Sequence, residues 1–374
     1  MIFVILSMLV GYVYEDSDSL IICNDSLTIC GKHQYNIKVQ ITNNGKIKVC
    51  PWKWNWPNDS IGWLFLDAPL IQLQSFSSIS GSECGYEGGS MANHPMGYGP
   101  GFGSAGGLSG GGGGGAAYGG NGGKGGDYYG GAGGIVYGDI SDTLIDLGSG
   151  GGAGRLSLVD GAGGDGGAKI YLRAKKILID SSYICTDGQR GFDGNMEAGG
   201  GGAGGGIMIR ADSFVINNSM ISARGGDGGD AEYGGGGGGA AGGRIKLFYS
   251  ACLDTANIVL SVQEGAGGLG SYVLPDSGQP GSIYIGPITC ITEGEEKPVE
   301  RFIVQTYLIK KTIKITIENP PMLVKLYDIS GRHIKTFWLE HHTEMFNLTD
   351  LNQGVYFLRS HDHNRYVAKI ILLD

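Results

Sequence analysis

The sequence predicts an all-β protein in which a glycine-rich parallel β-helix, or solenoid, is followed by a smaller C-terminal β-sandwich. Three observations predict this fold class. Short segments of alternating apolar and polar residues recur along the chain, one set of them repeats at a fixed interval, and glycine nearly disappears near the C-terminus. The first part, up to about residue 87, already alternates in this way at 35–41 and 47–49, on either side of an Asn-Asn-Gly turn.

Composition excludes several classes of protein. Glycine contributes 73 of 374 residues, but it keeps no strict period of three and only 11 prolines accompany it, so the chain is not collagen. A hydrophobic fraction of 41% is too high for a simple disordered linker. The net charge of −9 comes without a basic stripe, which argues against binding to nucleic acid.

The chain divides into four predicted segments. Residues 2–13 are almost entirely apolar, too few to cross a bilayer, and favour a signal peptide over 1–16, although no basic residue precedes them and no A-x-A site follows. The alternative is a buried first strand. The solenoid is expected over 17–290, a linker over 291–300 and the C-terminal domain over 301–374.

The middle of the chain contains a repeat of 37 residues. Three short apolar segments at 170–174, 177–180 and 183–185 recur in the same order from Ile207, appear earlier from Leu64, and return more weakly from Ile245. One unit cannot bury its own apolar face, but stacked units can. The repeat therefore predicts coils with a shared core, right-handed as parallel connections usually are, with Arg173 and Arg210 outside at equivalent positions.

Glycine tracts separate the strand units. Because glycine loses the most entropy on ordering, runs such as 110–115 and 234–239 are either flexible loops or packed, extended segments whose backbones approach closely. Their recurrence between strand units favours packing. Nearby tyrosines are candidate anchors: Tyr118, Tyr128, Tyr129, Tyr137 and Tyr233.

The seven cysteines follow no zinc-binding spacing. We expect most of them to be small buried side chains. In an exported protein Cys23 and Cys30 are candidates for a local bridge, and the odd number leaves at least one thiol unpaired.

The C-terminal part changes character near Lys297. Strands are expected at 312–317, 323–329, 333–339, 355–360 and 366–373, a density that favours an immunoglobulin-like β-sandwich. A hairpin turn is expected at 328–331, where Gly331 is able to take a positive φ. After Gly354, Val355 and Phe357 are expected to pack inward, with Leu358 as a third candidate.

Three motifs in this part follow one another to the end of the chain. The segments 324–332, 348–359 and 366–370 resemble, in order, the hairpin, the glycine-led strand and the lysine-containing last strand of the type IX secretion C-terminal sorting domain. The residues carrying the resemblance are Tyr327, Asp328, Gly331, Arg332, Gly354, Val355, Tyr356 and Lys369. The resemblance implies that this domain is an address read by outer-membrane secretion machinery. It also implies that the domain is often removed after export.

The glycine-rich part resembles exported surface proteins of bacteria. The segments that carry this weaker resemblance include 27–35, 41–45, and 137–139 leading to 147–150. The resemblance spans about 20–290 and implies a β-helical passenger carried by the sorting domain.

Few residues in the solenoid are candidates for binding or chemistry. Trp52, Trp54 and Trp56 alternate, which predicts a strand face for stacking on sugar rings or, the favoured interpretation, a cap over the N-terminal end of the solenoid. Arg173 and Arg210 are the aligned candidates for polysaccharide chemistry, with Asp180 nearby. A solvated face is the favoured interpretation of these three.

Metal binding has weak support in the sequence. Candidates for isolated calcium binding are the loop carboxylates Asp187, Asp193, Asp227 and Asp230, for which a solvated loop is the favoured interpretation. The histidines at 341, 342, 361 and 363 are expected to be exposed rather than zinc-binding. We therefore predict no metal site and no cofactor.

The sequence thus favours a secreted or cell-surface protein of structural or adhesive character, without catalytic residues. Its expected partner is the outer-membrane type IX machinery, with surface polysaccharide as a candidate ligand. The alternative is a β-helical carbohydrate-active enzyme or a polysaccharide-binding module.

Overall fold

The computed structural model contains two compact units, Met1–Thr289 and Cys290–Asp374, described separately below. In the first it describes residues 11–55, 61–92, 94–107, 110–140, 142–154, 161–271 and 273–287. In the second it describes 303–307, 312–316, 322–328, 332–341, 343–352, 354–360 and 367–372. These residues form strands, turns and extended segments without a helix, so no helix among them is able to cross a membrane. Most of the predicted signal peptide and the whole predicted linker lie outside the described residues.

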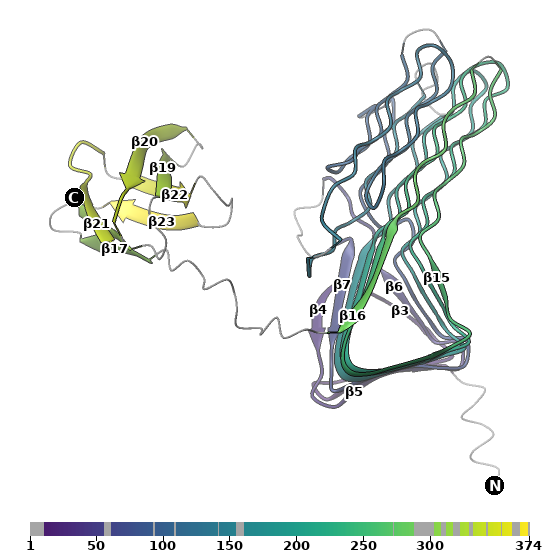
Figure 1. The fold of residues 1–374 in the computed structure, drawn as a ribbon, viewed down its shortest axis with the longest axis horizontal. Coiled ribbons are helices and arrows are strands. Elements are labelled where there is room, and N and C mark those ends of the chain that lie inside the picture. The colour runs from purple at the N-terminus through teal and green to yellow at the C-terminus, as the bar shows by residue number, and fades with distance from the viewer. Residues whose placement is uncertain are drawn as a thin grey trace. The chain divides into compact units, whose positions relative to one another are not determined.

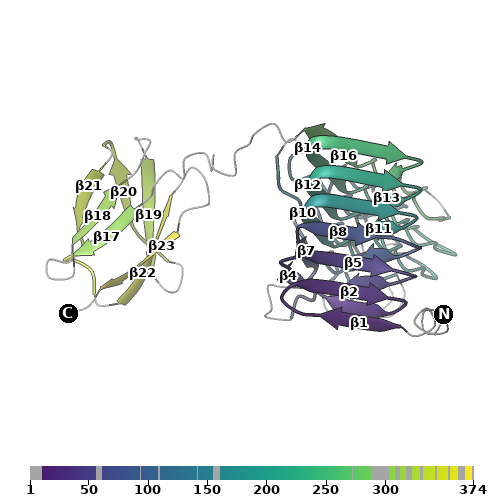
Figure 2. The ribbon, with the colours of Figure 1, turned by 90° about the horizontal axis from the view of Figure 1, so that it is seen from below.

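The strands of the first unit form two sheets (Figures 1 and 2). The described strands of these sheets pair in parallel, except that β1 is antiparallel to β2. The larger sheet contains β1 (Tyr12–Glu15), β2 (Ser19–Cys23), β4 (Gly31–Gln34), β5 (Lys38–Thr42), β7 (Trp63–Asp67), β8 (Leu70–Leu73), β10 (Lys169–Asp180), β12 (Gly206–Asn217), β14 (Arg244–Ala256) and β16 (Ser282–Pro287). The smaller contains β3 (Ser26–Ile29), β6 (Lys46–Val49), β9 (Ser78–Ser80), β11 (Tyr183–Cys185), β13 (Met220–Ser222) and β15 (Val259–Ser261).

Each turn of the chain makes one three-sided coil. The long strand β10 pairs with β7 over its first half and with β8 over its second half, so it bends around one corner and makes two sides. The smaller sheet supplies the third side, and Figure 1 shows the resulting triangle of strands. Successive coils lie directly over one another, as the stacked arrows of Figure 2 show.

The predicted repeat sets the register of the stack. Ile170 pairs with Ile207, which pairs with Ile245, and the same offset aligns Arg173 with Arg210. Alternate positions point inward, so the three isoleucines lie in one core with no exposed surface. The coils at 170 and 207 therefore share one interior, as the sequence predicts.

The two ends of the stack differ. At the N-terminal end β1 runs antiparallel to β2 and its four residues are exposed. At the other end β16 pairs with β14 alone, and its Ile283 and Ile285 are 38% and 47% exposed. The described stack thus ends in an antiparallel strand, Tyr-Val-Tyr-Glu, at one end and in a parallel strand with exposed isoleucines at the other.

The glycine-rich segments all leave the coils at one corner, between the third side and the first (Figure 1). Insertions of similar length follow β11, β13 and β15, at 186–205, 223–243 and 262–281. A much longer insertion, 81–168, follows β9. We call these packed segments the glycine frame.

Hydrogen bonds in the frame repeat every three residues. Along 112–117, the amides of 112 and 115 donate to the segment 123–126, those of 113 and 116 to 198–201, and those of 114 and 117 to 101–104. A polyproline-II helix has three residues per turn, so every third amide points the same way. The glycine tracts are therefore extended helices of this kind, and the packed alternative of the sequence analysis is confirmed.

Neighbouring tracts run in both directions. Amides at 198, 201 and 204 donate to carbonyls at 235, 238 and 241, which is a parallel pairing. Amides at 199, 202 and 205 donate to carbonyls at 192, 189 and 186, which is antiparallel. Each insertion thus runs out from the coil and returns beside itself, then bonds to the next insertion in the stack.

Glycine is required in the frame because the backbones touch. A methyl group added at Gly115 would lie 2.0 Å from the carbonyl oxygen of Gly239, and one added at Gly113 would lie 2.1 Å from that of Gly152. Such distances are far inside van der Waals contact, so no other residue fits without moving a neighbouring tract.

Two of the five candidate tyrosines anchor the frame. Tyr118 is buried and receives a hydrogen bond from the amide of Asp146 at 2.7 Å, and Tyr137 donates to the carbonyl of Leu147. The expectation was wrong for Tyr128, Tyr129 and Tyr233, which are at least 58% exposed. These three lie where the tracts turn, and a turn has no further backbone to cover a ring.

A buried lysine fastens a loop of the long insertion to the coils. Lys246 lies on the outer face of β14 with no exposed side chain. Its ammonium group contacts the carbonyls of Asp139, Asp142 and Leu144 at 2.6–2.9 Å and the Asp142 carboxylate at 2.7 Å. A small apolar cluster, in which Ile145 of the same insertion packs on Met208 and Phe248 of the coils, adds to these polar contacts.

The calcium candidates have a different role. Asp187 accepts the amide of Arg224, Asp193 that of Asp230, and Asp227 that of Ala266, each at 2.7–2.8 Å. Asp230 repeats the pattern with Leu269 at 2.6 Å. These carboxylates link one coil to the next through backbone amides, which explains their recurrence better than either solvated loops or a metal site does.

The predicted bridge between Cys23 and Cys30 does not form. The extended strand β3 lies between them and keeps them roughly 10 Å apart or more, beyond the reach of a disulfide. Asn43 instead donates to the sulfur of Cys23 at 3.4 Å.

The second unit is built from two antiparallel sheets. One contains β17 (Ile303–Tyr307), β18 (Thr312–Thr316) and β21 (Thr343–Asn347). The other, in the order β20, β19, β22, β23, contains β19 (Met322–Asp328), β20 (His333–Leu339), β22 (Gly354–Ser360) and β23 (Val367–Leu372). Buried side chains from both sheets, among them Ile313, Ile315, Val324 and Leu326, form one core.

The inward face of β22 differs from the expected one. Tyr356 and Leu358 are buried, whereas Phe357 is half-buried. Because alternate residues of a strand face opposite sides, Tyr356 and Leu358 set the core face and Phe357 lies opposite. The buried Tyr356 keeps a hydrogen-bond partner, because its hydroxyl group donates to the carbonyl of Asn352 at 2.9 Å.

Candidate functional site

The tryptophan segment lies at the root of the glycine frame. Residues 50–55 follow β6 without forming a strand, so the predicted tryptophan face on a strand is wrong. The favoured cap is also wrong, because β1 is the strand at the N-terminal end of the stack. Trp56 lies outside the described residues. Trp52 and Trp54 instead meet aromatic residues of the long insertion.

These aromatic residues form a cluster of parallel and edge-on rings. Trp54 lies parallel to Tyr98, with ring centres 6.4 Å apart and planes 6° apart. His94 stacks on Tyr98 at 4.6 Å, while Trp52 meets Tyr86 edge-on at 5.0 Å. Trp54 is 54% exposed, so a flat indole face remains open to solvent beside the insertion.

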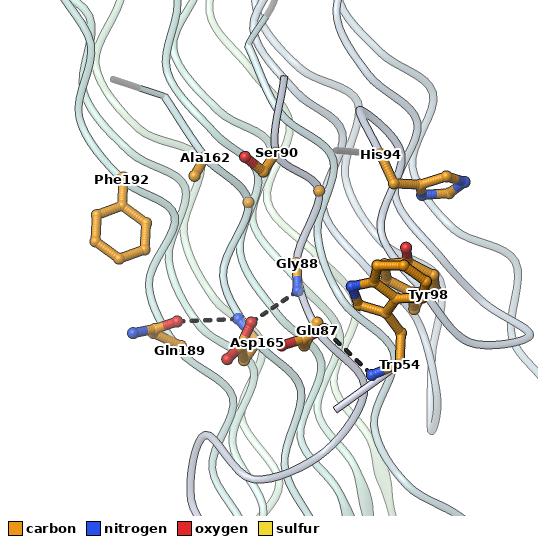
Figure 3. A pocket seen from close by; sticks show the side chains of 12 residues that line it. Trp54, Glu87, Gly88, Ser90, His94, Tyr98, Ala162, Asp165, Gln189 and Phe192 are labelled. Atoms are coloured by element: carbon orange, nitrogen blue, oxygen red, sulfur yellow. Dashed lines mark hydrogen bonds between the residues drawn. The ribbon is translucent and has the colours of Figure 1, made fainter. Parts of the chain in front are cut away.

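A hollow of about 290 Å³ opens beside this cluster (Figure 3). Aromatic side chains line it on two sides, with Trp54, Tyr98 and His94 on one and Phe192 on the other. Polar groups lie between them. These polar groups are Glu87, Ser90, Asp165 and Gln189.

Backbone contacts fix the polar groups of the hollow. The Asp165 carboxylate accepts the amide of Gly88 at 2.7 Å, and the Gln189 side-chain oxygen accepts the amide of Asp165 at 3.1 Å, as Figure 3 shows. Glu87 forms an ion pair with Lys53 at 2.5 Å. Burial raises the pKa of the Asp165 carboxyl, against the lowering effects of the Gly88 amide and Lys53.

This arrangement suits a ring-shaped polar ligand. A hollow with flat apolar walls and a few fixed polar groups binds ligands that have both kinds of surface. Sugar rings do, since their C–H faces stack on aromatic rings and their hydroxyl groups bond to carboxylates and amides. Its volume is at the lower end of ligand pockets, which fits one sugar unit of a polymer.

Sequence reasoning found only one member of this site, Trp54. Glu87, Tyr98 and Asp165 carry no recognisable spacing, because they come from different passes through the glycine frame. The remaining candidates do not converge. Arg173 binds Asp67 at 2.6 Å, and Asp180 pairs in register with Asn217 rather than with a second carboxylate.

No metal centre is found among the described residues, where three or more histidine, cysteine or acidic side chains never gather. His341 is exposed. The other three C-terminal histidine candidates, at 342, 361 and 363, lie outside the described residues.

The sorting-motif residues lie on three adjacent strands of the second unit. Asp328 ends β19, and its carboxylate accepts both the amide and the side-chain Nε of Arg332 at 3.0 Å. This ties the two ends of the hairpin turn together. Gly331 lies outside the described residues.

The other motif residues belong to strands of the same sheet. Tyr327 pairs with His333 across the hairpin and with Phe357 of β22. Gly354 is the first residue of β22 and Val355 the second. Lys369 of β23 pairs with Phe357. The described part of β23 bonds to β22 only, so this last strand forms an edge of its sheet.

Residues 309–373 match a family described as the secretion system C-terminal sorting domain. This segment is a type IX sorting domain. It includes β18 to β23 of the second unit and marks the protein for secretion or for the cell surface, with the type IX machinery as its partner. No curated protein matches the chain.

Proposed function

We propose that this exported protein is an adhesin of the cell surface that holds a polysaccharide. In this proposal the first unit is a right-handed parallel β-helix that supports the glycine frame. The second unit is an immunoglobulin-like sandwich used for sorting. The stacked parallel register and the two antiparallel sheets with one core support these assignments. The passenger needs no cofactor and carries out no reaction in this proposal.

One observation carries the adhesive role: an exposed Trp54 beside a hollow with fixed carboxylates. An exposed apolar patch rimmed by polar groups is typical of an interaction site, whereas a singly exposed ring is not. Here the ring is held flat by its stack on Tyr98, and the segment that carries it is tied down by Lys53 on Glu87. The binding face is therefore ordered before a ligand arrives, which lowers the entropy cost of binding.

Affinity electrophoresis of the full chain tests this role. Gels containing a neutral β-glucan, a xylan or an acidic polymer such as alginate should include at least one that retards the chain. Trp54→Ala should abolish the retardation, since stacking of a ligand ring on one aromatic side chain contributes about 1–3 kcal/mol. Trp338→Ala is the matched control, because Trp338 is 52% exposed but lies in the second unit.

Two results would contradict the proposal. One is the absence of retardation in every gel, and the other is equal retardation of the chain and its Trp54→Ala variant. Circular dichroism of the variant at the same time establishes that the coils remain folded.

An enzyme is the second candidate, and a specific observation favours it. Two carboxylates, Glu87 and Asp165, line one hollow, and the pKa of Asp165 is raised, as in glycosidases that use one acid and one base. Release of reducing ends from the retarding polymer, lost in Glu87→Gln, would support the enzyme. Retardation without release would support the adhesin.

A further inference from the structure

Cys30 and Cys50 occupy equivalent corners of the first two coils. The parallel pairing of β3 with β6 ends with Ile29 beside Val49, so the next residue of each strand is a cysteine. Neighbouring parallel strands lie about 4.8 Å apart, which is within the Cα separations that disulfides span. Hydrogen bonds hold both corners, since the Nε2 of the His33 ring contacts the Cys30 carbonyl at 3.1 Å and the amide of Gly62 donates to the Cys50 carbonyl at 2.9 Å.

The strand register places the two thiols side by side. Burial and a hydrogen bond with Cys50 raise the pKa of Cys30. Other described thiols have other partners: Cys84 donates to the carbonyl of Ser82 at 3.1 Å, and Cys185 to the hydroxyl of Ser80 at 3.3 Å. The contact between Cys30 and Cys50 is therefore specific to this corner.

We propose that Cys30 and Cys50 form a disulfide when the protein is exported. Both side chains are half-buried rather than buried, so a reagent is able to reach them from outside the stack. The corner after β3 is tight, because Gly31 with φ of +86° leads straight into β4 and no glycine insertion follows. The bond would join the first coil to the second where the frame does not.

The chemistry balances with a protein disulfide as oxidant. Both S–H bonds break and one bond forms between the two sulfurs, while the oxidant's S–S bond breaks and takes up the two electrons and the two protons to become two thiols. Exported proteins pass through compartments that maintain such oxidants. The raised pKa makes the thiolate scarce, so we expect slow oxidation without a catalyst.

Peptide mapping of the exported full chain tests the proposal. After free thiols are blocked with iodoacetamide, cleavage before Asp25 and after lysine separates Cys23 from Cys30. The expected product is the peptide 25–32 linked to the peptide 49–53, which separates into its two halves on reduction. Both peptides blocked as free thiols, or 49–53 linked to the peptide that contains Cys84, would overturn the proposal.

Thermal unfolding gives a second measurement. Reduction should lower the unfolding midpoint of the exported chain and should leave that of Cys30→Ser unchanged. Cys252→Ser is the matched control, because Cys252 is exposed and should not alter the response to reductant. A midpoint that reduction does not move in the unmutated chain would count against a bond that joins the coils.

Discussion

The coils and the glycine frame of the first unit are packed by opposite means. In the coils, side chains such as Ile170, Ile207 and Ile245 fill one interior, and backbone pairing between neighbouring strands sets the spacing of the coils. In the frame, most contacts are made directly between backbones, and few side chains such as Tyr118 lie among them. One region is stabilised by burial of apolar surface, while the other depends on hydrogen bonds between tracts.

The difference shows what a polyglycine segment needs in order to be ordered. Fixing glycine costs more entropy than fixing any other residue, and it offers no side chain to bury. The frame offsets this by giving almost every amide a carbonyl partner on one of three neighbours. It also grows from a corner of the coils, so the strands fix the ends of each insertion and shorten the conformational search.

The largest expected effect is that of Gly115→Val. Its Cβ would lie 2.0 Å from the Gly239 carbonyl oxygen, so two tracts must separate, and we expect a loss of about 4 kcal/mol or more in stability. Chemical denaturation of the full chain measures it. Ala117→Gly, in the same tract, should cost about 1 kcal/mol or less. A frame that tolerates the valine would contradict close backbone packing.

Ile209→Ala tests the coils in the opposite direction. Ile209 is completely buried in β12, so its loss leaves a cavity and should cost about 3 kcal/mol. In the coils the removal of atoms destabilises, whereas in the frame their addition does. A loss below about 1 kcal/mol in denaturant titrations would show that the core is not tightly packed.

Lys246→Met tests the fastening between the two regions. The change leaves three carbonyls without their ammonium partner and should cost about 2 kcal/mol, since the partly exposed Asp142 can still turn to water. Amide exchange should rise over 137–145 and stay unchanged over 207–216. Equal exchange in both segments would mean that the lysine does not hold the loop.

The smallest effect is a pH dependence at the hollow. Burial raises the pKa of Asp165, so the folded state holds this proton more tightly than the unfolded chain, and stability falls as pH rises through the window above the usual aspartate pKa. Asp165→Asn should therefore gain stability relative to the unmutated chain between about pH 3.5 and about pH 7.

Asp193→Asn is the control of opposite sign. The Asp230 amide lowers the pKa of Asp193, so its charge stabilises the fold at higher pH, and the same change should lose stability there. Melting midpoints across this pH range measure both. Parallel curves for the two variants would contradict the assigned shifts.

The coils were predictable because the pattern of their side chains determines how the strands pair. The alternation at 170–174 and its copy from Ile207 fix both the facing of the strands and their register. The same reasoning located five strands of the second unit but not β17 or β21, and it was wrong on which side Phe357 faces.

The frame and the hollow were harder to predict. Glycine has no side chain, so the tract 112–117 carries no signal of its three neighbours, and Tyr98 and Asp165 meet only through those neighbours. The alternating tryptophans suggested a strand, but their packing on Tyr86 and Tyr98 decides the conformation instead. The spacing of Asp193 and Asp230, equal to the repeat of 37 residues, was an available sign of a ladder between coils.

Amide hydrogen exchange of the full chain tests most directly whether the glycine tracts form an ordered, hydrogen-bonded frame. The account predicts that amides over 112–117, 198–205 and 237–243 exchange as slowly as those of β12, because each of these tracts bonds to its neighbours. Exchange of these tracts at the rate of an unfolded chain, while β12 stays protected, would contradict it.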